Sequence, residues 1–295
     1  MAIDFKALGA KAVAEGADQT KSVAGGDYEA PAAGPCLLRF IGYIELGKQK
    51  TSFKGVPGVK EQVELIFELV GKRHPPREAA DGTKIPHRIS VTESYSLNEK
   101  ANFFKLFQRM NYRQDAQHIV QLLGEGFKGE VIHDVWKGKD GKDRTTATLR
   151  NAAGYTIAPP RKEDEDSETG WVDVAVPPAL SELRCFLWQQ ADLAQWGSLF
   201  IEGTYPERKD EKTGVVTPGR SKNVFQNKIL GAVNFDGSPI HLLLLANGSK
   251  IDIPDVHEQD GLDPDDNPEA GAAPAPAAAP PAKVSAPADA LGGIV

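Results

Sequence analysis

The chain has 295 residues, of which 40% are hydrophobic, and a formal net charge of −7. This length allows one large or two small domains with an ample core, and the lack of any run of about 18 apolar residues excludes a membrane-spanning helix. The charge is unevenly distributed, because residues 35–160 carry 20 Lys and Arg against 14 Asp and Glu, whereas residues 251–295 carry nine acids and one Lys. A basic body of net charge +6 favours polyanionic partners, and an acidic tail of −8 can compete for the same surface.

The N-terminal residues 1–34 mix Ala, Gly and charged residues, and we expect a short helix or a loose arm. The opening MAIDFKALGAKAVAEG lacks the apolar stretch of a secretory signal, so we expect a cytoplasmic protein. The two cysteines, Cys36 and Cys185, are far apart and belong to no CxxC or Cys/His cluster. They predict buried, reduced thiols rather than a disulfide or a zinc site.

From Cys36 onward the pattern becomes strand-like. Residues 36–46 and 61–70 are rich in β-branched and aromatic residues, and the second segment alternates apolar and polar residues as a half-buried strand does. Between them lies a basic segment, 47–60, whose glycines predict a long hairpin loop. A third strand is predicted at 85–95.

A helical segment follows the third strand. Ser96 and Glu99 have the spacing of a capping box and predict the start of a helix, and residues 115–124 predict a second helical stretch. Two more strands are predicted at 127–138 and 144–158. Three strands, a helical segment and two strands match the five-stranded OB barrel, in which a helix lies between strands three and four. Other small barrels and α+β sandwiches share this order, so the predicted class is mainly β with helices, OB-like, over residues 35–160.

After an acidic break at 161–170, residues 171–250 have balanced charge and predict a smaller α+β extension that packs on the core. We expect helices at 181–196 and 221–233 and a strand at 198–207. From residue 251 the chain is acidic and then Ala/Pro-rich. Such a composition buries too little apolar area to offset its ordering entropy, so 251–295 is predicted to be a disordered acidic tail.

Motifs for catalysis are missing. The six histidines have no metal-ligand spacing, no nucleophile-elbow, Walker A or dinucleotide-binding pattern occurs, and the acidic run 163–166 lies within a polar loop. We therefore predict a non-enzymatic protein without a metal or cofactor.

Two hairpins combine positive charge with an aromatic ring, as single-strand binders require. In the 47–60 loop the ring is Phe53, which either stacks on bases or folds onto the barrel. In the turn between strands four and five the ring is Trp136. Since the first and the fourth-to-fifth loops of an OB fold flank one binding face, we expect both hairpins on the same side of the barrel. The basic residues around them are Lys48, Lys50, Lys54, Lys60, Lys137, Lys139, Lys142 and Arg144.

Three further residues, Arg88, Tyr95 and Arg150, lie on the intervening strands. They line the groove in one interpretation and are ordinary strand residues in the other. The apolar residues of 186–200 indicate a packing surface or a self-association patch.

The run GPCLLRFIGYIELGKQKTSFKGVPGVKEQVELIFELV resembles a pattern of single-stranded DNA-binding proteins from tailed bacteriophages. In that pattern a first strand ends in an Asp/Glu-Leu-Gly turn, and a basic glycine loop leads to a strand ending in Trp/Phe-Glu-Leu. The passage IPHRISVTESYSLNEKANFFKLF is similar to the strand-then-helix passage of the same family, and SLFIEG, SKNVFQNKI and NFDGSPI resemble extensions of some members.

The resemblance spans roughly residues 35–245. It implies an OB fold, a role in DNA replication or recombination in the cytoplasm of an infected bacterium, and replication or recombination proteins as partners of the acidic residues 252–269. The leading prediction is a protein that coats single-stranded DNA without sequence preference. The alternatives are a virion or assembly module that self-associates, and a metal-dependent nuclease or other replication enzyme.

Overall fold

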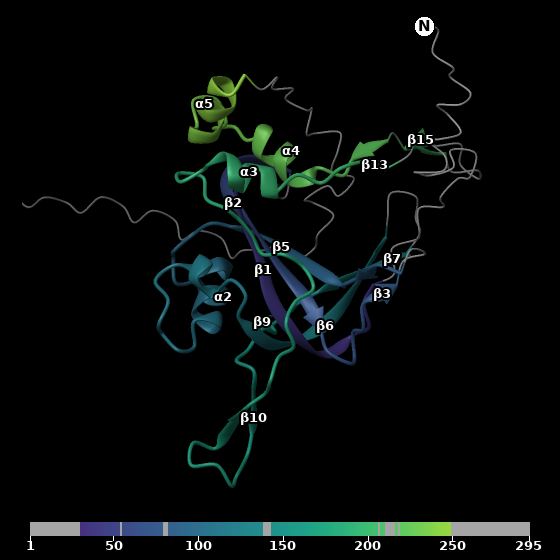
Figure 1. The fold of residues 1–295 in the computed structure, drawn as a ribbon, viewed down its shortest axis with the longest axis vertical. Helices are drawn as coiled ribbons and strands as arrows, with labels where there is room; N and C mark the ends of the chain where they lie inside the picture. Colours follow the sequence, from purple (N-terminus) through teal and green to yellow (C-terminus); the bar gives the residue numbers. More distant parts are fainter. Residues whose placement is uncertain are drawn as a thin grey trace, which may run out of the picture.

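The computed structural model describes residues 30–53, 55–78, 82–137, 143–205, 207–209, 216–217 and 219–248, with the backbone alone for Phe53, Tyr205, Arg208, Lys209, Thr217 and Arg220. None of the helices in these ranges has both the length and the apolar character needed to cross a membrane. As predicted, the protein is mainly β with a few helices, and it is built around one large sheet (Figure 1). The predicted tail and most of the predicted N-terminal arm lie outside the described residues.

Five strands of the large sheet follow the path β5-β2-β1-β6-β7, and every neighbouring pair on this path is antiparallel. β1 pairs with β2 along its length, with irregularities in register after Phe40 and Glu45 that bend so long a strand. The predicted order of three strands, a helical segment and two strands is confirmed. The strands are β1 (Gly34–Phe53), β2 (Val56–Val70), β5 (Arg88–Ser94), β6 (Gly126–Lys137) and β7 (Asp143–Thr148).

The predicted five-stranded barrel is not closed, because β5 and β7 end the path and do not pair with each other in the described part of the chain. After Thr148 the chain turns into a short ribbon, and side chains rather than backbone hydrogen bonds bridge the gap. The Tyr155 hydroxyl donates to Glu93 Oε1 (2.5 Å), and Arg150 Nη1 lies 3.6 Å from the same oxygen. These three residues form the seam between β5 and the chain after β7.

Between β5 and β6 lie the helix α2 (Asn102–Met110) and a 3₁₀ helix, η1 (Ile119–Leu122). The capping box predicted at Ser96 and Glu99 is wrong, since α2 begins after Ala101 and has no side-chain cap. The burial of its apolar side chains Phe103, Leu106 and Met110 stabilises this helix instead.

A capping box does form at η1. The His118 ring accepts from the backbone N–H of Val120 (3.3 Å), and the Gln121 side chain accepts from the backbone N–H of His118 (2.8 Å). A histidine in the capping position lies outside the usual Ser, Thr, Asp and Asn set, which is why the sequence pattern did not identify it.

Apolar side chains cover both faces of the central strands. The inner cluster joins the sheet to α2, η1 and the chain after β7 through Leu38, Phe40, Leu65, Phe67, Phe103, Leu106, Phe127, Val131, Leu149 and Ile157. The outer cluster joins β1 and β2 to the C-terminal part of the chain through Ile41, Ile44, Leu46, Ile66, Phe186, Trp188, Leu199, Phe225, Ile229, Phe235, Ile240 and Leu244. Because both faces are covered there, residues 40–44 of β1 and 63–70 of β2 are all buried.

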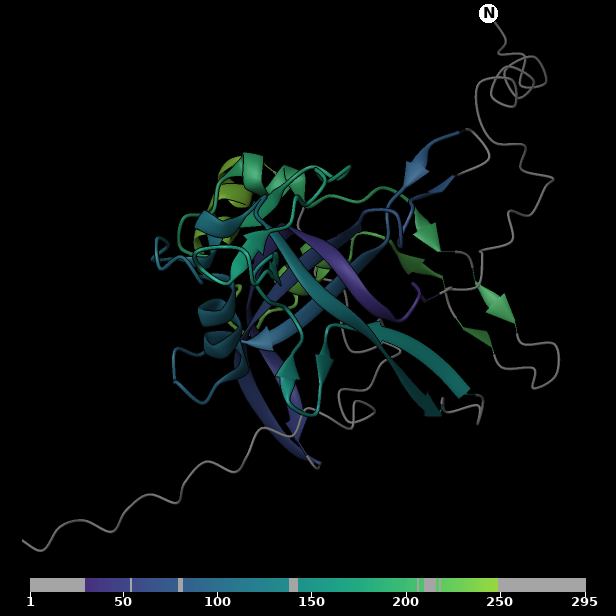
Figure 2. The same ribbon diagram turned by 90° about the horizontal axis from the view of Figure 1, so that it is seen from below.

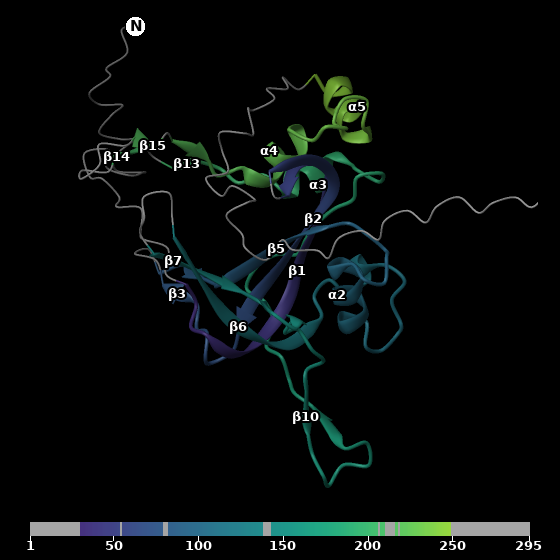
Figure 3. The same cartoon turned by 180° about the vertical axis from the view of Figure 1, so that it is seen from behind.

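The C-terminal part contains a strand where a helix was predicted. Arg184–Phe186 forms β12, which pairs in parallel with Gly42–Ile44 of β1, on the edge that β6 leaves after Arg39. Three helices follow, α3 (Leu193–Ser198), α4 (Val224–Leu230) and α5 (Pro239–Ala246). They gather over the end of the sheet where β1 turns into β2 (Figures 1 and 3).

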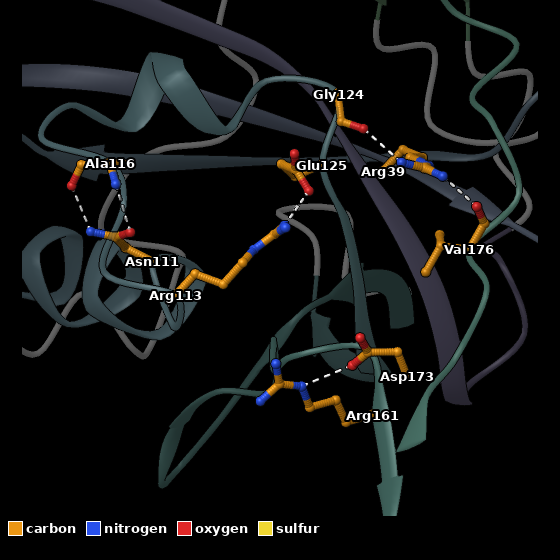
Figure 4. Close-up of polar contacts among 9 residues, drawn as sticks. All are labelled: Arg39, Asn111, Arg113, Ala116, Gly124, Glu125, Arg161, Asp173 and Val176. Carbon is orange, nitrogen blue, oxygen red and sulfur yellow. Dashed lines mark hydrogen bonds and ion pairs between the residues drawn. The ribbon is translucent and has the colours of Figure 1, made fainter. Parts of the chain in front are cut away.

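Arg39 ties this C-terminal part to the sheet (Figure 4). Its guanidinium donates to the carbonyl oxygens of Gly124 (2.7 Å), Pro177 (2.7 Å) and Val176. The neighbouring Gly126 packs so closely that a Cβ there would lie 2.7 Å from Val176. The chain thus crosses β1 and β6 at a fixed place before it enters β12.

Short two-stranded ribbons complete the fold. The β10/β11 ribbon, held by the ion pair between Arg161 and Asp173 (2.9 Å, Figure 4), projects from the end of the molecule away from α3, α4 and α5 (Figure 3). The ribbons are β3 (Arg77–Glu78) with β4 (Lys84–Ile85), β8 (Arg150–Asn151) with β9 (Gly154–Tyr155), β10 (Arg161–Glu163) with β11 (Trp171–Asp173), β13 (Thr204–Tyr205) with β16 (Arg220–Ser221), and β14 (Arg208–Lys209) with β15 (Val216–Thr217).

Candidate nucleic-acid interface

The β6/β7 hairpin carries a half-buried tryptophan beneath a cation. Trp136 lies directly opposite Arg144 in the antiparallel register, and the Arg144 guanidinium lies 5.4 Å from the centre of the ring. The indole Nε1 donates to Thr146 Oγ1 (3.0 Å). These contacts hold the ring in one orientation and place a positive charge beside it, a combination that favours stacking of a base near a phosphate.

The direction of this tryptophan follows from strand alternation. Val131 and Ala147 are buried in the inner cluster. Trp136 is an odd number of residues from Val131 along β6, and Arg144 is an odd number from Ala147 along β7, so their side chains point to the opposite face. Trp136 and Arg144 therefore lie on the outer face of the hairpin. Lys137 is exposed and opposite Asp143.

The β1/β2 hairpin forms a second basic projection. Lys48, Lys50 and Lys60 are exposed on its two strands, and the chain at Lys48 is fixed because its backbone N–H donates to Asn234 Oδ1 (2.7 Å) and its carbonyl accepts from Val233 (2.8 Å). The preceding Gly47 has φ +75°, and a Cβ there would lie 2.3 Å from the Trp188 ring. The C-terminal part of the chain thus supports the base of this hairpin.

Several predicted residues of the two hairpins cannot be placed. Lys54, Lys139 and Lys142 lie outside the described residues, and Phe53 ends β1 without a described side chain. Whether Phe53 stacks on bases or folds onto the sheet stays a prediction.

The two hairpins leave the long strand β1 at opposite ends, and the expectation that they flank one side of the barrel stays a prediction. The β1/β2 hairpin leaves β1 at its C-terminal end, whereas β6 pairs with β1 over Gly34–Arg39 and runs past Gly34 into the β6/β7 hairpin. Because β6 is antiparallel to β1, its hairpin must leave at the N-terminal end of β1. The two hairpins therefore project separately from opposite ends of one bent strand (Figure 2).

The three candidates on the intervening strands make structural contacts. Arg88 Nε donates to Ser181 Oγ (2.9 Å), and burial, with Arg184 nearby, lowers the pKa of Arg88. The Tyr95 ring lies 5.1 Å from the Phe103 ring at the edge of the inner cluster. Arg150 belongs to the seam described above.

The outer face of β2 is occupied by the chain itself. Glu68 is buried and accepts from the backbone N–H groups of Leu180 (2.6 Å) and Ser181 (2.9 Å). Glu64, also buried, lies 3.4 Å from Lys228 Nζ of α4. Two buried carboxylates under the chain's own segments leave no room for a polyanion on this part of the sheet.

Neither cysteine is fully exposed, since Cys36 is buried and Cys185 is partly buried. Burial raises the pKa of the Cys36 thiol to about 12 and also raises the pKa of Cys185, so both thiols are protonated and unreactive at neutral pH. Across the described ranges, no three His, Cys, Asp or Glu side chains gather as metal ligands would.

A cavity of about 380 Å³ was not predicted from the sequence. It lies beside β6 and the chain after β7, and its lining includes Arg109, Lys128, Glu130, Asn151 and Thr156. These residues come from three separate segments, so no local pattern in the sequence connects them.

The chain matches no protein-family model, and no curated protein or solved structure is significantly similar to it.

Proposed function

We propose that this protein binds single-stranded DNA without sequence preference, coating and protecting it during DNA replication or recombination, and that it does not catalyse a reaction. The observation that carries the proposal is the Trp136 ring on the outer face of an exposed hairpin with the Arg144 guanidinium 5.4 Å from its centre. A stacking ring beside a cation is the basic unit of sequence-independent single-strand recognition.

The arrangement of strands supports the same proposal. Five antiparallel strands with a helix between the third and the fourth, open along one side, fit an OB-like barrel, and OB folds are commonly partly open. OB folds bind oligonucleotides on the face of strands two and three and on the first and fourth-to-fifth loops. Since the chain's own C-terminal part covers β2, we assign binding to the two hairpins, which correspond to those loops.

The two hairpins give a DNA strand two separate contacts. Lys48, Lys50 and Lys60 lie on one, and Lys137 and Arg144 lie with Trp136 on the other. A flexible strand that touches both would cross the molecule from one end of β1 to the other. Phage origin, host cytoplasm and docking of replication proteins on residues 252–269 are parts of the proposal that rest on the sequence resemblance alone.

The decisive experiment is a titration of the intrinsic tryptophan fluorescence with oligo-dT at a series of salt concentrations. If about four phosphates are neutralised, the slope of log K against log salt is about −3, from about −0.7 for each contact. Absence of binding, or an affinity that does not change with salt, would contradict the proposal. Incubation of labelled DNA with Mg²⁺ in the same series tests the nuclease alternative, which predicts cleavage.

A second candidate function is a virion or assembly module that associates with other copies of the same chain. The predicted patch at 186–200 is mostly internal, since Phe186, Trp188 and Leu199 are buried against the sheet. On α5, however, Leu242 and Leu245 are 57% and 55% exposed, and exposed apolar side chains favour association. Sedimentation with and without oligo-dT separates the two candidates, because only the first predicts a DNA-dependent change.

A further inference from the structure

We propose that the cavity between α2, β6 and the chain after β7 is a second subsite for the same DNA strand and binds a nucleotide through its phosphodiester. This inference rests on the proposed function. The volume of about 380 Å³ lies in the range of small-molecule sites, and the cavity is distinct from both hairpins.

The charge of the lining favours an anion. Arg109 donates to the carbonyl of Tyr155, and Lys128 donates to the carbonyl of Arg161. A neutral carbonyl orients a cation without neutralising it, and neither cation has a carboxylate partner within the described part of the chain. With Glu130 also in the lining, the site keeps one excess positive charge, which matches one phosphodiester.

Uncharged donors add to this set. Asn151 Oδ1 accepts from the backbone N–H of Ala153 (2.9 Å), which fixes the side chain and leaves its amide N–H groups for a ligand. Thr156 Oγ1 is occupied by Glu130 and Leu149. An amide nitrogen and two cations around one cavity form a donor set suited to phosphate oxygens.

The cavity and the tryptophan are connected by one strand, β6. Lys128 and Trp136 are eight residues apart on β6, so strand alternation places them on the same face. At roughly 3.3 Å per residue the two positions are about 26 Å apart. A strand stacked on Trp136 would reach the cavity only if it is several nucleotides long.

The test compares the wild-type protein with the double variant Arg109→Gln/Lys128→Gln on oligo-dT of about four and about sixteen nucleotides, lengths that span known site sizes. For the long oligomer we expect a salt slope less steep by about 0.7, the value for one lost phosphate contact. For the short oligomer, bound at Trp136, we expect no change. Lys105→Gln, an exposed residue one turn earlier on α2, is the matched control.

The variant Asn151→Asp is a second test of the cavity, and it removes no hydrogen bond that holds the structure. The carboxylate still accepts from Ala153 but adds a negative charge to the cavity, so the long oligomer should bind more weakly at low salt while the thermal unfolding midpoint stays unchanged. Unaltered binding of the long oligomer by both variants, with Trp136→Ala still weakening it, would overturn the subsite and leave the proposed function intact. Failure of the wild-type protein to bind any oligomer would overturn both.

Discussion

At the scale of single residues, the structure divides the predicted binding residues by what already occupies them. Arg88 and Arg150 each have a protein partner, Ser181 and Glu93 respectively, and Tyr95 packs at the edge of the core. Trp136 instead has its ring on an exposed hairpin, held at one edge by Thr146. Residue type alone does not distinguish a strand arginine in a seam from one in a groove, because the distinction depends on a partner far away in the sequence.

Replacing Trp136 by Ala should weaken binding of oligo-dT by about 1–3 kcal/mol, the range for loss of one stacked base. Trp136→Phe should retain most of the affinity, because a phenyl ring still stacks. Fluorescence anisotropy of a labelled oligomer measures both variants.

The matched control for that series is Trp171→Ala. Trp171 is 45% exposed on the β10/β11 ribbon, away from both hairpins, so its loss should leave affinity unchanged. Equal affinity of Trp136→Ala and wild type would move the stacking site elsewhere.

At the scale of elements, side chains replace the hydrogen bonds that would have closed the barrel. Glu93 lies in β5, while Tyr155 and Arg150 lie in the ribbon after β7. Burial raises the pKa of Glu93, although the hydrogen bond from Tyr155 and the charge of Arg150 oppose the increase. An acid whose pKa is higher in the folded state binds more protons there than in the unfolded state, so stability falls as the pH rises through that window.

The free energy of unfolding of the wild-type protein should therefore increase, relative to that of Glu93→Gln, as the pH is lowered from neutral toward the ordinary carboxyl value of 4.5. Urea unfolding of both proteins across this range measures the difference. Glu99→Gln, an exposed residue outside the seam, should show no such trend. A difference that shrinks as the pH falls would contradict the assignment of Glu93.

At the scale of the whole molecule, the separation of a basic body from an acidic end predicts that the acidic end regulates DNA binding. Residues 251–295 carry −8, so the chain without them has a net charge of +1 instead of −7. If the acidic segment competes with DNA for the basic hairpins, its removal should tighten binding at low salt. The effect should vanish at high salt, where the attraction is screened.

The measurement compares oligo-dT affinity of the full chain with that of a chain ending at residue 250. A full-length variant with the acids of 252–269 changed to Asn and Gln separates charge from length, since it should behave like the deletion. Weaker binding by the shortened chain would refute competition.

The five main strands and their order were predictable from the sequence, because alternate apolar residues such as Val63, Leu65 and Phe67 share the strand face that packs in the inner cluster, and this alternation is a local pattern. Prediction failed where a partner distant in sequence decides the outcome. Cys185 belongs to a strand because β6 leaves the edge of β1 free at Gly42–Ile44, and nothing within 181–196 encodes that free edge.

The sequence by itself determined where the five main strands lie, that the body is basic and the end acidic, and which hairpins carry Phe53 and Trp136. Only the tertiary structure decided that these hairpins leave opposite ends of β1, that the barrel stays open at Glu93, and that Arg109 and Lys128 share a cavity. The physical reason is that strand alternation and net charge are properties of neighbouring residues along the chain. Register, barrel closure and cavities depend instead on which distant segments pair.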